Sequence, residues 1–152
     1  MHDRSNGPPG DRNGWCAARF RVRYAETDAG GVVHHSAYLP WFEEGRSELG
    51  RRSGLPYREL EAGGVVLVVV RAEARYHASA RYDERIAVWT RMTDVRSRRC
   101  VFEYRVVCED DGRLLATGFT DHVPVGRDNG RPTRLPKPFL ECWRASAGRE
   151  LE

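Results

Sequence analysis

Residues 24–46 read YAETDAGGVVHHSAYLPWFEEGR, a stretch that combines a glycine-rich loop with the start of a long helix. The run Asp28-Ala29-Gly30-Gly31 predicts a loop whose backbone approaches its neighbours closely. Apolar residues then recur at spacings of three and four over residues 37–52, which predicts an amphipathic helix with Ser36 as its N-cap. Gly45 lies on the apolar side and predicts close packing against a sheet or second helix, because a helical glycine costs about 1 kcal/mol relative to alanine.

In the segments before and after this helix, apolar and polar residues alternate along the chain, which is typical of half-buried β-strands. One strand is expected before the helix, at residues 18–24. A short helix or turn is expected at residues 57–62. Four more strands are expected at residues 65–77, 86–95, 99–108 and 114–125. The pair Asp111-Gly112 predicts a hairpin between the last two. Together these elements indicate an α+β chain whose last three strands form an antiparallel meander.

Length and composition predict one domain without a membrane span. The chain has 152 residues, of which 40% are hydrophobic and 31% are charged, as in ordinary globular domains. We expect residues 1–14 to be a disordered lead-in without the apolar core of a signal peptide, residues 15–143 to form the domain, and residues 144–152 to be a loose tail. The longest apolar run, residues 65–70, is far shorter than the roughly 18 residues that a spanning helix needs.

Charge and cysteine content exclude some classes of protein. The net charge of +3 is too small to indicate a nucleic-acid-binding protein. All but one of the 25 basic residues are arginine, which reflects either codon choice in a GC-rich genome or a use of planar guanidinium groups on phosphate or carboxylate. The cysteines show no C-x-x-C pair and no zinc-ligand spacing, so we expect free thiols, no metal site and a cytoplasmic protein. They are Cys16, Cys100, Cys108 and Cys142.

The loop and helix of residues 24–46 resemble the 4-hydroxybenzoyl-CoA thioesterase branch of the hotdog-fold superfamily, and most closely the acyl-CoA thioesterases associated with the Tol-Pal system. Further landmarks are Ser53-Gly54-Leu55-Pro56 after the helix, ASARYD at residues 78–83, and Leu135-Pro136. The resemblance implies a hotdog fold, in which a five-stranded antiparallel sheet wraps around one long central helix. It also implies a homodimer or homotetramer with its sites at the subunit interface.

This resemblance implies a role for each matching residue. Asp28 is the nucleophile or general base that acts on a thioester carbonyl, and the backbone N–H of His35 donates to the oxyanion. Gly30 and Gly31 let the loop pass close to the acyl group, and Tyr38 is a candidate substrate contact. The implied reaction hydrolyses a short-chain or aromatic acyl-CoA to a free acid and coenzyme A. It needs no metal or redox cofactor, because coenzyme A is part of the substrate.

Structural interpretations stand beside these roles. Asp28 in an Asp-Ala-Gly-Gly sequence is typical of a turn residue, and the pair His34-His35 is open to a weak metal site or a solvated helix start. Arg96 and Arg98 lie between two predicted strands, where they form either a solvated turn or a clamp for the phosphates of coenzyme A. Core packing is the main expectation for the aromatic residues of the helix, Tyr38, Trp41 and Phe42.

Other residues leave further alternatives. Another hotdog branch uses a helix carboxylate as its catalyst, but the Asp loop of this chain favours a solvated or interface charge for Glu44. His77 and His122 are expected at the surface or an interface. His34 and Ser36 stand where the closest relatives usually have Tyr and Asn, which leaves the acyl preference open. Two rival functions are a thioesterase acting on acyl-carrier-protein or polyketide thioesters, and a non-catalytic acyl-CoA-binding module.

Overall fold

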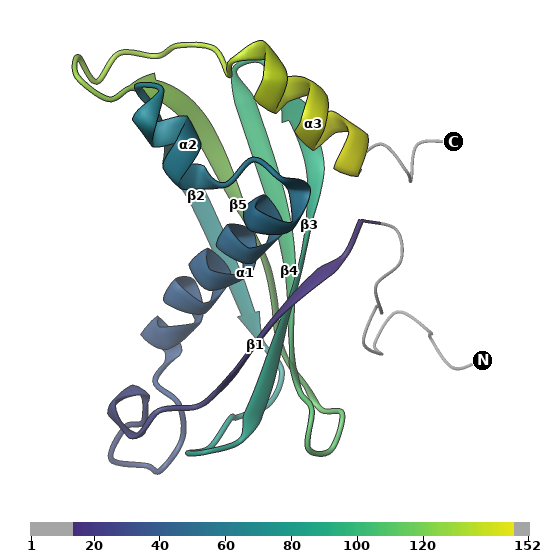
Figure 1. Cartoon of the computed structure of the whole chain (residues 1–152). Coiled ribbons are helices and arrows are strands. Elements are labelled where there is room, and N and C mark those ends of the chain that lie inside the picture. The colour runs from purple at the N-terminus through teal and green to yellow at the C-terminus, as the bar shows by residue number, and fades with distance from the viewer. Residues whose placement is uncertain (1–13, 148–152) are drawn as a thin grey trace.

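Helix α1 (Tyr38–Ser53) lies across one face of an antiparallel sheet (Figure 1). The computed structural model describes residues 14–147. The strands are β1 (Cys16–Arg21), β2 (Val65–Tyr76), β3 (Arg85–Arg96), β4 (Arg99–Cys108) and β5 (Leu114–Gly126). The shorter helical elements are α2 (Tyr57–Ala62), α3 (Lys137–Ala147) and the 3-10 turns η2 (Tyr24–Glu26) and η3 (His35–Ala37).

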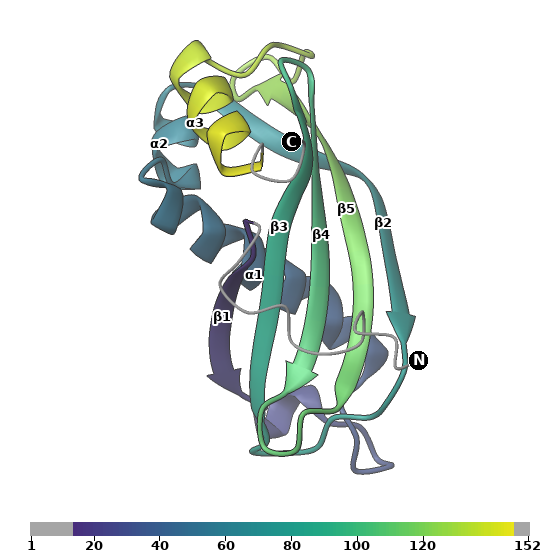
Figure 2. The ribbon, with the colours of Figure 1, turned by 90° about the vertical axis from the view of Figure 1, so that its right-hand side faces the viewer.

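The strands are arranged in the order β1-β3-β4-β5-β2, and all neighbouring pairs are antiparallel (Figure 2). β3, β4 and β5 form the predicted meander, while β1 and β2 are the two edges. The structure therefore confirms the α+β class and the hotdog fold, with a five-stranded antiparallel sheet around one long helix.

The aromatic residues of α1 pack as their spacing predicts. Tyr38, Trp41 and Phe42 are all buried in the core between the helix and the sheet. The Phe42 ring stacks on Tyr104 of β4 with 4.3 Å between ring centroids. These contacts hold the N-terminal half of α1, and the loop that precedes it, against the sheet.

At Gly45, the backbone of α1 lies close to side chains of β3. A methyl group at this position would lie 2.8 Å from Val88 Cγ1 and would press against Thr90. Real side chains do not approach this closely without displacement. The predicted close packing of the helix against a sheet is confirmed.

Two predicted boundaries near the loop are wrong. β1 ends at Arg21 and does not continue to Tyr24, because Tyr24 begins the turn η2 and its side chain is exposed. Ser36 is not the N-cap of α1. The N-cap is Ala37, which makes no side-chain hydrogen bond to the helix. Ser36 lies inside the extra turn η3 and donates its N–H to His34 Nδ1 at 3.2 Å. Helical periodicity does not distinguish such a 3-10 turn from the helix that follows it.

The C-terminal segment also differs from its prediction. α3 continues to Ala147, so the loose tail is wrong for residues 144–147. Trp143 is fully buried and makes ring contacts with aromatic residues of α2, β4 and α3 itself, which closes one end of the core. The rest of the predicted tail, residues 148–152, and residues 1–13 of the predicted lead-in lie outside the described residues.

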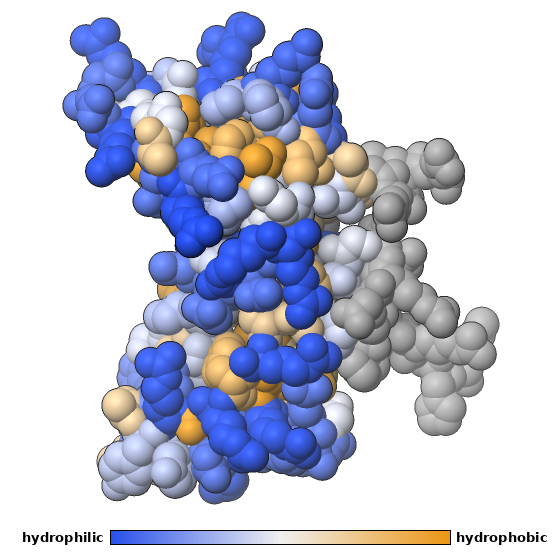
Figure 3. Space-filling model, in the orientation of Figure 1, coloured by the Kyte–Doolittle hydropathy of each residue, from blue (hydrophilic) through white to orange (hydrophobic). Residues whose placement is uncertain are grey.

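The surface shown in Figure 3 is mostly hydrophilic, with hydrophobic areas below α2 and α3 and in the lower half of the view. Exposed apolar side chains also lie on the edge strand β2, where Val68, Val69 and Val70 are 43%, 42% and 57% exposed. An edge strand with exposed apolar side chains is open to pairing with another strand. Within residues 14–147, no helix combines the length and apolar content needed to cross a bilayer.

Candidate active site

The segment from Thr27 to Val33 forms a closed loop before the start of α1. Thr27 and Val33 pair as an isolated antiparallel bridge, and the Asp28 N–H donates to the Val32 C=O at 2.9 Å. Gly31 has a φ of +79°, a left-handed conformation that favours glycine, and its N–H donates to the Asp28 C=O at 3.0 Å. Backbone hydrogen bonds therefore determine the shape of the loop.

The exposed Asp28 side chain holds the turn through one of its two carboxylate oxygens. Oδ1 accepts the N–H of Gly30 at 2.8 Å. A Cβ atom at Gly30 would lie 3.1 Å from the same oxygen, which explains the glycine. Oδ2 accepts no hydrogen bond from residues 14–147. Asp28 therefore stabilises the turn through Oδ1, while Oδ2 remains available for chemistry.

Glu26 ties the loop to the helix, and sequence reasoning missed it. Its Oε2 accepts the indole N–H of Trp41 at 2.6 Å, and its Oε1 accepts the N–H of Arg23 at 2.8 Å. Its backbone C=O accepts the N–H of His34 at 2.8 Å. The available signal was local, because a Glu at the third position of a helical turn is part of a capping box.

The turn η3 places the His35 N–H between the loop and α1. No residue of the described chain accepts a hydrogen bond from this N–H. The groups around it are held in place, since Ser36 donates to His34 and the Tyr76 hydroxyl donates to the His35 C=O at 3.0 Å. The first N–H groups of a helical segment lack intrahelical acceptors and attract negative charge. The His35 N–H is therefore suited to bind a developing anion.

Tyr38 is buried among aromatic rings at the base of this site. Its ring centroid lies 4.7 Å from that of Trp41 and 5.1 Å from that of Tyr76. Burial raises the pKa of the Tyr38 hydroxyl. In the single chain, Tyr38 supports the site from the core, and the ring beside it that solvent reaches is that of Tyr76.

Arg96 and Arg98 lie at the turn between β3 and β4, and Figure 1 shows this turn at the opposite end of the sheet from the segment that leads into α1. Arg96 is the last residue of β3 and Arg98 lies in the turn to β4, whereas the Asp28 loop is bonded to the segment before β3, because the Val33 N–H donates to the Ala80 C=O. The 12 residues of β3 separate these ends by about 36 Å. Arg96 donates to Asp94 at 3.1 Å, and Arg98 is exposed. One chain therefore does not bring these arginines to Asp28.

His122 is placed differently from its prediction. It is only 1% exposed, and its Nε2 lies 2.8 Å from Thr120 Oγ1. Burial, together with the positive charge of Arg46, lowers the pKa of His122 to about 3, so the ring is neutral near pH 7. The surface or interface position expected for His122 is wrong, because β5 turns this side chain toward α1. His77 and Glu44 are exposed, as expected.

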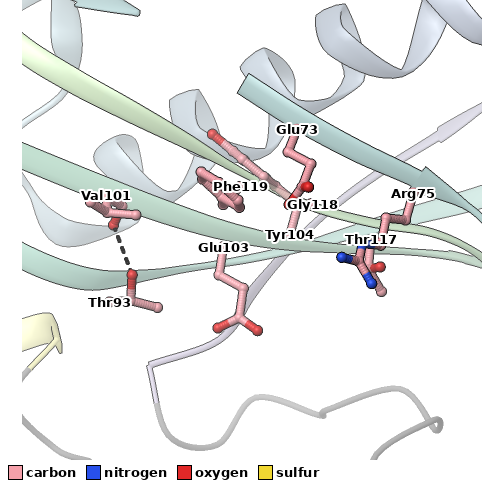
Figure 4. A pocket seen from close by; sticks show the side chains of 9 residues that line it. All are labelled: Glu73, Arg75, Thr93, Val101, Glu103, Tyr104, Thr117, Gly118 and Phe119. Atoms are coloured by element: carbon pink, nitrogen blue, oxygen red, sulfur yellow. Dashed lines mark hydrogen bonds between the residues drawn. The ribbon is translucent and has the colours of Figure 1, made fainter. Parts of the chain in front are cut away.

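Two pockets of the described chain lie outside the Asp28 loop. One of about 480 Å³ opens on the face of the sheet opposite α1, where the Glu103 carboxylate points away from the helix (Figure 4). The other, of about 410 Å³, lies between β1 and the start of α1 and includes Glu26 and Trp41. Neither pocket is lined by Asp28 or His35. In a single chain, neither of these two pockets therefore encloses the exposed loop.

One group of possible metal ligands occurs within the described residues. Ligand atoms of Glu84, Cys108 and Asp110 lie within 4.8 Å of one another. Arg113 pairs with Glu84, and Arg85 pairs with Asp110 at 2.7 Å. These guanidinium groups already neutralise both carboxylates, so the group does not fit a cation.

Comparison with known proteins joins this geometry to a family. The model described as the Thioesterase-like superfamily matches residues 22–142. The chain belongs to this superfamily. The chain is also 38% identical over 120 residues to the acyl-CoA thioester hydrolase YbgC of Escherichia coli O157:H7, across 79% of this chain and 89% of that protein.

Solved structures agree with membership of the thioesterase-like superfamily. The hypothetical protein TT1821 of Thermus thermophilus has a TM-score of 0.80 and 41% identity, and the match covers 85% of this chain and 97% of that chain. The DHNA-CoA thioesterase of Staphylococcus aureus has a TM-score of 0.80 and 29% identity, covering 89% of each chain. The family predicted from residues 24–46 is thereby confirmed.

Proposed function

We propose that this thioesterase-like protein hydrolyses an acyl-CoA thioester, with a short-chain or aromatic acyl group, to a free acid and coenzyme A. The observation that carries the proposal is that the Thr27–Val33 loop presents the Asp28 Oδ2, which accepts no hydrogen bond from residues 14–147, and that the turn directly after it presents the His35 N–H, which has no acceptor there. Acyl transfer requires a nucleophile or base together with a donor where negative charge develops. The names of YbgC and of the DHNA-CoA thioesterase support this chemistry.

Two routes fit this arrangement. In the covalent route, Asp28 attacks the thioester carbonyl, the C–S bond breaks, the thiolate takes a proton from solvent, and water hydrolyses the resulting anhydride. In the general-base route, Asp28 takes a proton from a water molecule while the oxygen of that water attacks the carbonyl. The C–S bond then breaks, and the proton passes from Asp28 to the leaving thiolate. In both routes the His35 N–H stabilises the oxyanion, while Gly30 and Gly31 leave space for the acyl group. Neither route uses a metal or redox cofactor.

We propose further that the active unit is a homodimer formed through β2. The exposed valines at positions 68–70 lie on a free sheet edge, which is open to another strand. Two copies of one strand related by a twofold axis normal to the sheet run antiparallel. The second copy would also cover Asp28 and His35, which one chain leaves exposed. The same pairing serves a homotetramer built from two such dimers.

Antiparallel pairing brings opposite ends of the two copies together. Within one chain, β2 starts beside Arg127, whose N–H donates to the Gly64 C=O at 2.8 Å. The same strand ends at Tyr76, whose hydroxyl contacts His35. The Arg127 end of one copy therefore lies beside the His35 end of the other.

The Arg127 end carries a group of arginines that we call the arginine end. The members of the arginine end are Arg98, Arg127, Arg131 and Arg134. None of these four side chains forms an ion pair with the described residues. A hydrogen bond of 2.7 Å from the Leu135 N–H to the Ser97 C=O joins the β3–β4 turn to this segment. We propose that Arg98, with Arg96 beside it, binds phosphates of coenzyme A, because guanidinium groups form bidentate, charge-assisted bonds to phosphate.

We propose a cytoplasmic location for this enzyme. None of the four cysteines forms a disulfide in the described residues, and three of them, Cys16, Cys100 and Cys108, are buried. A core that contains reduced cysteines and depends on no disulfide is typical of a reducing compartment.

The proposed reaction is tested by following thiol release from a panel of acyl-CoA substrates that vary in acyl length and aromaticity. Wild-type protein is expected to hydrolyse members of the panel. Asp28→Asn is expected to lower kcat by about 10²–10⁴, the usual contribution of an acid–base group, without lowering the unfolding midpoint. Glu141→Gln removes an exposed carboxylate on α3 and is expected to keep the wild-type rate. Wild-type turnover by Asp28→Asn would contradict the role of Asp28.

The same thiol-release assay, extended to acyl-carrier-protein thioesters and paired with a measurement of acyl-CoA binding, separates the rival functions. Preference for acyl-carrier-protein thioesters would indicate a carrier-protein thioesterase, and acyl-CoA binding without thiol release would indicate a non-catalytic module. Arg96→Ala and Arg98→Ala are expected to raise the KM for acyl-CoA but not for an acyl-pantetheine thioester, which lacks the nucleotide phosphates. Equal effects on both substrates would contradict the phosphate clamp.

A further inference from the structure

Tyr76 connects the end of β2 to the turn that carries the His35 N–H. Its hydroxyl donates to the His35 C=O at 3.0 Å, across 41 positions of the chain. The same carbonyl accepts the N–H of Tyr38, the residue that begins α1. One donor from the sheet and one from the helix therefore hold the peptide group that follows His35.

We propose that Tyr76 is a positioning residue that directs the His35 N–H toward the reacting carbonyl, an inference that rests on the proposed function. The N–H and C=O groups of His35 belong to adjacent rigid peptide planes that meet at one Cα atom. A constraint on the carbonyl therefore restricts the orientation of the N–H as well. An oxyanion donor is effective when its direction is set before the reaction, because reorientation during the reaction costs part of the stabilisation.

The ring and the hydroxyl of Tyr76 have separable roles. The ring forms a T-shaped contact with Tyr38, at 5.1 Å between centroids and an interplanar angle of 76°. Phenylalanine retains this contact and removes only the hydrogen bond. The Tyr76 side chain is 50% exposed, and the His35 C=O keeps its bond from Tyr38, so the loss leaves no buried polar group without a partner. Tyr76→Phe is therefore a local change.

Tyr76→Phe in the full-length protein tests the proposal. We expect kcat for the best acyl-CoA substrate to fall about tenfold with KM unchanged, because the donor acts on charge that develops only in the transition state. Calorimetry with a thioether analogue of that substrate, which has no carbonyl to polarise, is expected to give the wild-type affinity. Hydrogen–deuterium exchange of residues 34–38 is expected to be faster, because the His35 C=O loses one of its two donors.

Tyr82→Phe is the matched control. Tyr82 is 57% exposed, lies at the same end of the molecule beside Tyr24, and its hydroxyl makes no hydrogen bond with residues 14–147. This variant is expected to keep both the wild-type kcat and the wild-type exchange of residues 34–38. Unchanged kcat and exchange in Tyr76→Phe would overturn the proposal, as would an equal fall of kcat in both variants or a rise of KM alone.

Failure of the proposed function gives a different result. In that case wild-type protein releases no thiol from any acyl-CoA, and Asp28→Asn changes nothing. Failure of the Tyr76 proposal alone leaves the wild-type enzyme active and sensitive to Asp28→Asn, with Tyr76→Phe as active as wild type.

Discussion

His122 is one ionisable side chain whose effect on stability depends on pH. Burial and the charge of Arg46 lower its pKa to about 3 in the folded chain, from an ordinary value of 6.5. Between these values the unfolded chain binds a proton that the folded chain excludes. The contribution of His122 therefore reduces stability as the pH falls below about 6.5, and it has no effect above that pH.

We expect this residue to lower the free energy of unfolding by at most about 1.4 kcal/mol per pH unit in that window. Urea unfolding at about pH 7.5, about pH 6 and about pH 5 measures the slope. His122→Gln is expected to show a shallower slope than wild type, whatever its absolute stability. His77→Gln, which changes an exposed histidine, is the matched control for the loss of one histidine. Equal slopes in wild type and His122→Gln would show that His122 does not titrate in this way.

Residue-scale predictions succeed where the governing interactions are local. The loop around Asp28 and Gly31 is readable from sequence because an Asp turn and a left-handed glycine depend on a few consecutive residues. The burial of His122 is not readable, because it depends on the pairing of His122 with Cys100 across β5 and β4. Glu26 lies between these cases, since its capping role is local but its bond to Trp41 is not.

At the scale of one element, α1 contains two buried glycines that meet different surroundings. A methyl group at Gly45 would lie 2.8 Å from Val88 Cγ1, whereas the nearest atoms to a methyl group at Gly50 would be 3.7 Å away. We expect Gly45→Ala to destabilise the protein by about 1–3 kcal/mol through overpacking. Gly50→Ala should stabilise it by up to about 1 kcal/mol, because alanine favours the helix. Urea unfolding of both variants checks this, and a loss at Gly50 with none at Gly45 would reverse the conclusion.

The elements themselves differ in how well sequence predicts them. β4 occupies residues 99–108 as predicted, because alternation across a half-buried strand is a strong signal. α3 was not predicted, because its apolar positions, such as Phe139 and Trp143, form a short pattern directly after Pro138. Its burial depends on the open end of a core that distant segments build. The turn η3 was absorbed into the predicted start of α1 for lack of a separate signal.

For the whole molecule, the proposed dimer makes β2 the sensitive edge. Val70→Asp places a carboxylate on this edge, where pairing with a second copy would bury it without a partner. We expect the dimer dissociation constant to rise at least about tenfold, since an unpaired buried charge costs several kcal/mol. Light scattering coupled to gel filtration measures the mass. Ala145→Asp on the exposed side of α3 is the control and should leave the mass unchanged. A Val70→Asp protein with wild-type mass would exclude pairing through β2.

Assembly is the scale at which sequence is least informative about the site. Asp28 and Arg98 can each be recognised in the chain, but the topology separates them by the length of β3. Sequence patterns describe neighbours along the chain and across a strand, whereas the relation between these two residues depends on how two copies pair. The interface was expected from family resemblance and not from any pattern in the residues.

The separation of Asp28 from the arginine end has a genetic consequence if the dimer pairs through β2. A mixed dimer of one Asp28→Asn chain and one Arg98→Ala chain would hold one site with both defects and one site with neither. Two impaired alleles would then complement each other, with about a quarter of all sites fully restored in a random mixture. Thiol release by mixed, refolded chains would reveal the gain, and a rate no higher than the mean of the two parents would argue against shared sites. A cell that carries both alleles would then keep part of the activity that a cell with either allele alone lacks.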